Sequence, residues 1–183
     1  MNIYQIQIAL IRSEQLIWRR LLIPSNLLLP DLHLIIQVSM GWENDHLYQF
    51  IKGKIFYSPE DDTEDVEYEN IKISDLLKKE KEKIVYEYDF GDSWKHDVIL
   101  EKILSDDKKL KSSVCLEGKM ACPPEDCGGI WGYSDMLEIL KHQDHEDYEN
   151  IMEWLGGEFD PEYFDKDSIN KILKKFKINR LEN

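Results

Sequence analysis

The sequence lacks a long hydrophobic run and a recognisable export signal. Its longest apolar stretch, residues 27–40, is broken by Pro30, Asp31 and His33, and it falls short of the ~20 consecutive apolar residues that a membrane-spanning helix needs. The first residues hold neither the basic segment nor the apolar core of a secretory signal. These absences predict a cytoplasmic protein with no membrane partner.

Basic residues are scarce relative to acidic ones. The chain has 23 Lys and Arg against 37 Asp and Glu, which gives a formal net charge of -14. A surface of this sign repels phosphate backbones at long range and does not favour nonspecific binding of nucleic acid. Nucleic acid is therefore not expected as a partner. Part of the acidity lies in residues 60–69, a composition typical of a hydrated loop.

Cysteine occurs only three times, at Cys115, Cys122 and Cys127. Thiols stay reduced in the cytoplasm, where clustered cysteines more often bind metal or carry out chemistry than form disulfides. His96 would complete a Cys3His set suited to zinc, and His46 and His142 are the other candidates for the fourth ligand. The spacing does not match the two-residue gap of a zinc knuckle. Two alternatives therefore stay open: a redox pair of the last two cysteines, and a loop stiffened by proline and glycine.

Hydrophobic periodicity in the first two thirds of the chain predicts antiparallel strands. In residues 3–10 apolar side chains alternate with polar ones, the pattern of a half-buried strand, and residues 16–23 supply its partner. A helix is predicted over residues 30–40, because proline suits its first turn and Gly41 suits the left-handed position after its end. Further strands are predicted over residues 46–51, 54–57, 83–90, 94–104 and 109–116.

The last third of the chain changes to helical periodicity. Apolar residues recur at helical spacing in residues 148–155 and 169–176. Another helix is predicted over residues 133–142. Asp167 is the expected N-cap of the last helix, since a carboxylate there can accept hydrogen bonds from the first free N–H groups.

Together these patterns predict an α+β fold. We expect an antiparallel sheet of about five to seven strands packed against helices, with a mainly helical C-terminal third. With 183 residues, of which 42% are hydrophobic, the chain suits one domain with a packed core. This single domain would span residues 1–183, strand-rich over 1–118 and with a loop and helices over 119–183.

Residues 88–96 form a polar and aromatic turn between two predicted strands. In a functional interpretation, Asp89, Asp92 and His96 converge to hold a metal or relay a proton. In a structural interpretation, the aspartates bond to turn N–H groups and the histidine packs on an aromatic ring. The residues alone leave both interpretations open.

Several motifs in series give a resemblance to a known family. They are Trp18-Arg19-Arg20, residues 32–37, Gly41-Trp42, residues 46–50, residues 88–96, and the segment from Cys115 to Tyr133. In this order, over about residues 4–176, the chain resembles the plasmid pRiA4b ORF-3-like family. The resemblance implies an α+β domain. Some members are described as passengers of mobile elements or as resolvase-like, but this chain supports neither a recombinase nucleophile nor a basic DNA-binding surface.

The family motifs gather in three turns, at residues 41–46, 90–96 and 122–132, and loops held by a rigid scaffold often carry function. We predict that these turns meet in one pocket with an aromatic and acidic lining. Its residues would be Trp42, His46, Asp89, Asp92, Trp94, His96, Cys122, Glu125, Asp126, Trp131 and Tyr133. Such a pocket favours a non-catalytic domain that binds a protein segment or a small molecule. The alternatives are a metal-dependent, zinc-type hydrolase-like enzyme and an accessory protein of mobile genetic elements.

Overall fold

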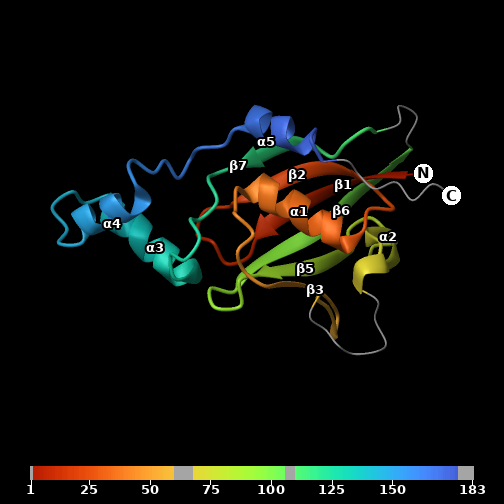
Figure 1. Ribbon diagram of the computed structural model, residues 1–183, viewed down its shortest axis with the longest axis horizontal. Coiled ribbons are helices and arrows are strands. Elements are labelled where there is room, and N and C mark those ends of the chain that lie inside the picture. The colour runs from red at the N-terminus through yellow and green to blue at the C-terminus, as the bar shows by residue number, and fades with distance from the viewer. Residues whose placement is uncertain (1, 60–67, 106–109, 177–183) are drawn as a thin grey trace.

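A seven-stranded antiparallel sheet forms the centre of the protein (Figure 1). The computed structural model describes residues 2–59, 68–105 and 110–176. Across the sheet the strand order is β4-β3-β5-β6-β1-β2-β7. The strands are β1 (Asn2–Leu10), β2 (Trp18–Pro24), β3 (Tyr48–Lys52), β4 (Ile55–Tyr57), β5 (Lys83–Tyr88), β6 (Trp94–Ser105) and β7 (Val114–Lys119).

One helix covers a face of the sheet, and the others lie at its margins (Figure 1). The described α-helices are α1 (Leu29–Met40), α2 (Ile73–Leu76), α3 (Gly129–Leu140), α4 (Tyr148–Leu155) and α5 (Lys166–Leu173). Helix α1 packs on the sheet through Leu32, Ile35 and Ile36, which are buried. Helices α3 and α4 lie beyond one end of the sheet, and α5 lies beside β7. No helix in the described part of the chain is both long and apolar enough to span a membrane.

The alternation of side chains along β1 explains why the sheet is buried on its helix-covered face. Tyr4, Ile6 and Ile8 are buried, while the residues between them are only partly so. Antiparallel pairing sets Tyr4 opposite Ile23 and Ile6 opposite Leu21, so the apolar residues of both strands share one face. The predicted half-buried pair of strands is therefore confirmed.

Arg19 occupies a position on the buried face of β2, and it fixes the end of α1. The guanidinium donates from Nε to the carbonyl of Ser39 at 2.8 Å and from Nη1 to the carbonyls of Trp18 and Lys119 at 2.8 and 2.9 Å. Burial lowers the pKa of Arg19. Its hydrogen bonds to main-chain oxygens tie the C-terminal end of α1 to β2 and β7, which positions the turn that follows α1.

The α+β class and the antiparallel sheet are confirmed, but the predicted distribution of helices needs correction. Helices α1 and α2 precede the last third of the chain, so helices are not mainly confined to that third. Helix α3 begins at Gly129, ahead of the predicted residue 133. The N-cap of α5 is Asp165 instead of Asp167, because its Oδ1 accepts the N–H groups of Asp167 and Ser168. Most of the acidic run, residues 60–67, lies outside the described residues.

A candidate binding cleft where three turns meet

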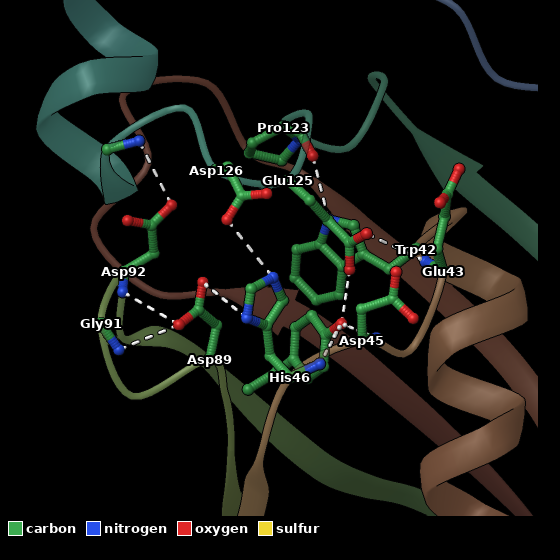
Figure 2. Close-up of polar contacts among 12 residues, drawn as sticks. Trp42, Glu43, Asp45, His46, Asp89, Gly91, Asp92, Pro123, Glu125 and Asp126 are labelled. Atoms are coloured by element: carbon green, nitrogen blue, oxygen red, sulfur yellow. Dashed lines mark hydrogen bonds and ion pairs between the residues drawn. The ribbon is translucent and has the colours of Figure 1, made fainter.

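Three turns from distant parts of the sequence come together at one end of the sheet (Figure 2). The helix-end turn (residues 41–47) follows α1, the aspartate turn (residues 89–93) joins β5 to β6, and the cysteine loop (residues 120–128) joins β7 to α3. An open cleft of about 570 Å³ lies between the helix-end turn, the cysteine loop, the last turn of α4 and the segment that follows α4. It is lined by Met40, Gly41, Trp42, Glu43, Asp45, His46, Cys122, Pro123, Pro124, Glu125, Asp126, Trp154 and Phe159.

Left-handed backbone conformations are concentrated in these turns. Gly41, at φ 93°, ends α1, and Asn44 follows at φ 68°. Asp89 and Ser93 bound the aspartate turn at φ 55°, and Asp126 bends the cysteine loop at φ 58°. Asn and Asp tolerate this conformation better than other non-glycine residues, yet each such position costs free energy. The chain therefore accepts local strain in the three turns that meet at this end of the sheet.

The hydroxyl of Tyr88, the last residue of β5, links the helix-end turn to the cysteine loop. It accepts a hydrogen bond from the backbone N–H of Asp45 at 3.0 Å and donates one to the carboxylate of Glu125. The other oxygen of Glu125 accepts the N–H of Glu43 at 3.2 Å. Burial, reinforced by the hydrogen bond to Glu125, raises the pKa of Tyr88. The phenol therefore stays protonated at neutral pH and can keep donating to Glu125.

Trp42 forms the inner wall of the cleft and fastens the cysteine loop to the end of α1. Its indole Nε1 donates to the carbonyl of Pro123 at 3.0 Å, and its ring stacks on Tyr88 with the centroids 5.0 Å apart. The side chain is almost fully buried. A buried indole with its N–H satisfied is a rigid anchor for the loop.

His46 lies between two carboxylates from different turns (Figure 2). Its Nδ1 is 3.8 Å from Oδ2 of Asp89, and its Nε2 is 3.3 Å from Oδ1 of Asp126. Asp89 is 8% exposed, and its Oδ1 accepts the N–H groups of Gly91 and Asp92 at 2.9 and 3.3 Å. The Asp126 side chain is 72% exposed. One ligand atom from each of these three residues lies within 4.8 Å of the others.

The aspartate turn and the cysteine loop are in direct backbone contact. Oδ2 of Asp92 accepts the N–H of Gly128 at 3.2 Å. A Cβ added at Gly129 would lie 2.6 Å from the carbonyl oxygen of Asp92, and Gly129 has φ 67°. Only glycine fits this approach without a shift of one segment.

Six of the predicted pocket residues do not line the cleft. Two of them, Asp89 and Asp92, belong to the aspartate turn and contact the other two turns, at His46 and Gly128. The period-two alternation of β6 directs Trp94 and His96 into the core, where both are buried and His96 meets Trp42 edge to face. Burial lowers the pKa of His96 to about 3. Trp131 is 79% exposed and lies in a separate hollow beside the aspartate turn. Tyr133 is buried among core residues.

The cysteines lie in three different settings. Cys115 is buried in β7 with its thiol 3.7 Å from the carbonyl of Glu117, Cys122 lines the cleft, and Cys127 lines a hollow beside α3 and α4. Burial raises the pKa of all three thiols, that of Cys127 to about 12. In the described part of the chain, the residues whose ligand atoms lie close enough together to hold a metal ion are His46, Asp89 and Asp126. Neither a cysteine nor His96 belongs to this group. The geometry therefore gives no support to the predicted Cys3His set.

Four charged or aromatic residues of the cleft were not predicted from the sequence. Glu43 and Asp45 lie between Trp42 and His46, so their position in the same turn was a usable signal. Trp154 and Phe159 gave no such signal, because they reach the cleft through the placement of α4 beyond the end of the sheet, which depends on tertiary packing.

Replacing Tyr88 by phenylalanine should destabilise the protein by about 1–2 kcal/mol, because Glu125 and the N–H of Asp45 lose a shared partner. Chemical denaturation monitored by tryptophan fluorescence measures this change. Tyr163→Phe is the matched control, since that hydroxyl is exposed and makes only a 3.5 Å contact with Asp165. Equal costs for the two variants would contradict the linking role of Tyr88.

The fold and cleft define an acidic α+β domain with an open, aromatic-walled and carboxylate-rich cleft at one end of an antiparallel sheet. The chain belongs to the plasmid pRiA4b ORF-3-like family, whose sequence profile matches residues 2–168. The resemblance seen in the motifs is thereby confirmed.

Two similar proteins extend over most of the chain. The uncharacterized protein y4hQ of Sinorhizobium fredii is 30% identical over 177 residues, which cover 94% of this chain and 91% of that protein. The crystal structure of a protein of unknown function, MM3350 from Methanosarcina mazei Go1, matches with a TM-score of 0.80 and 39% identity, covering 90% of this chain and 96% of that one. These similarities establish family and fold, and their descriptions name no activity.

Proposed function

We propose that this protein is a non-catalytic binding domain whose cleft receives a positively charged group of a small molecule or a protein segment. The observation that carries this proposal is the charge of the lining. Four carboxylates line the cleft, and no Lys or Arg is among its described lining residues. They are Glu43, Asp45, Glu125 and Asp126. Each unneutralised carboxylate lowers the free energy of a cation placed between them.

The aromatic walls suit the same class of ligand. Trp42 forms the inner wall, and Phe159 and the 50% exposed Trp154 also line the cleft. A cation over the face of a tryptophan gains from the electrostatic potential of the ring. The volume of about 570 Å³ falls within the range of ligand pockets.

A fluorescein-labelled hexalysine peptide tests this proposal, with fluorescence anisotropy as the measurement in buffered salt near physiological strength. The double variant Glu43→Gln/Glu125→Gln should bind the peptide about tenfold more weakly, because two attractive charges are lost while the hydrogen-bonding shapes are kept. Glu14→Gln/Glu69→Gln is the matched control, since these exposed residues carry the same charge outside the cleft.

Comparing the two double variants separates binding of the peptide in the cleft from general attraction of the peptide to a chain with net charge -14. If both double variants weaken binding equally, the peptide responds to the overall charge and the cleft is not its site. Absence of binding by the native protein would also reject the proposal.

A further inference from the structure

The two carboxylates beside His46 are held in different ways. Asp89 is nearly buried and is fixed by the two N–H groups that its Oδ1 accepts from its own turn. Asp126 is largely exposed and approaches the imidazole from the cysteine loop. His46 thus has one carboxylate neighbour that is anchored and another that can adjust its position.

The second oxygen of Asp89 adds an independent observation. This oxygen faces Nδ1 of His46 at 3.8 Å, which is beyond hydrogen-bond distance. A cation beside a nearly buried carboxylate is attracted more strongly than one at the surface, because less water screens the charge. Neither Asp89 nor Asp126 forms an ion pair with a Lys or Arg of the described ranges.

We infer that His46, Asp89 and Asp126 hold a divalent transition-metal ion at the edge of the cleft. This inference rests on the proposed function, since it names one cation that the cleft takes. One imidazole nitrogen and carboxylate oxygens within 4.8 Å of one another are a ligand set suited to Zn²⁺ or Mn²⁺. Calcium and magnesium sites are built mainly from oxygen ligands.

The exposure of Asp126 leaves the cleft side of this ion open to water or to a ligand group. An ion with three protein ligands and an open position is the arrangement of metal sites that act on ligands, whereas structural zinc sites are closed by four protein ligands. The alternative prediction from the sequence, a metal-dependent hydrolase-like enzyme, also requires a bound metal ion.

Manganese is the probe that tests the inference, because the three free cysteines would also bind zinc. The fraction of bound Mn²⁺ is measured by electron paramagnetic resonance on chelator-treated protein. Native protein should bind one equivalent, and His46→Ala and Asp126→Asn should each raise the dissociation constant at least tenfold. His142→Ala is the matched control, since His142, just after α3, forms a similar exposed pair with Glu138 at 3.2 Å.

Each outcome decides a separate point. Equal Mn²⁺ affinity in the native protein, His46→Ala and His142→Ala would overturn the metal site. Hexalysine binding without Mn²⁺ binding would reject the metal site and leave the proposed cation-binding cleft standing. Failure of both probes would reject both. Thermal unfolding of the metal-free variants confirms that they fold, as expected for substitutions of partly exposed side chains.

Discussion

Lowering the pH from 7 to 5 is expected to reduce the free energy of unfolding by about 4 kcal/mol, because two buried histidines remain neutral in the folded protein. Burial lowers the pKa of His33 from 6.5 to about 4 and that of His96 from 6.5 to about 3. Between these values and 6.5 the unfolded chain binds more protons than the folded chain. The stability contributed by the two residues is therefore complete above pH 6.5 and is lost as the pH falls.

The hydrogen bonds around His33 select one tautomer of its neutral ring, while burial lowers its pKa and the bond to Asn44 partly opposes that effect. Gln37 donates from Nε2 to the hydroxyl of Tyr86 at 2.9 Å, and that hydroxyl lies 2.8 Å from Nδ1 of His33. The other ring nitrogen of His33 meets Oδ1 of Asn44. Because this oxygen is an acceptor, Nε2 carries the proton and Tyr86 donates to Nδ1. The network also ties α1 to the helix-end turn, two residues before His46.

Denaturation with urea at pH 7, 6 and 5 measures the pH effect, and His33→Gln and His96→Gln should each remove about half of the slope. Carbon-13 and nitrogen-15 chemical shifts of the imidazoles supply an independent measurement in the folded state. Both rings should stay neutral at pH 5. Titration of either ring near pH 6.5 in the folded protein would contradict the assignment for that residue.

Much of the fold could be predicted because local patterns and tertiary structure agree. The alternation in residues 3–10 reports a strand whose one face is buried, and that strand pairs as β1 near the centre of the sheet. Gly41 ends α1 in the left-handed conformation expected from its position. The start of α3 was placed too late because two glycines, Gly129 and Gly132, lie inside its first turn, and glycine is normally a sign of a loop.

The site was less predictable because motifs identify segments and do not say which side chains face outward. Trp94 and His96 belong to a motif that does reach the site, but they lie on the core-facing side of β6. There both rings pack against Trp42, the inner wall of the cleft. Asp89 lies at the end of β5, where its side chain turns back onto its own loop and reaches His46. Trp154 enters through the packing of α4, a long-range arrangement that no local pattern encodes.

Replacing Gly132 by alanine is expected to destabilise the protein by about 3 kcal/mol, since overpacking at a backbone contact cannot be relieved by a side-chain rotation. A Cβ at this position would lie 1.9 Å from the carbonyl oxygen of Cys127. Either α3 or the cysteine loop must move, and Asp126 immediately precedes Cys127. If the inferred metal site is correct, the affinity for Mn²⁺ should fall at least tenfold as well.

Gly156→Ala is the control for Gly132→Ala because it separates steric conflict from loss of backbone freedom. Gly156 has φ 70°, and a Cβ there would meet nothing within 4 Å. Its replacement should therefore cost only about 1 kcal/mol, the strain of a left-handed alanine, and should leave Mn²⁺ affinity unchanged. Urea denaturation and Mn²⁺ titration of both variants give the comparison. Equal stability losses, or a Gly132→Ala variant that keeps native Mn²⁺ affinity, would show that the cysteine loop does not depend on its contact with α3 to hold Asp126 beside His46.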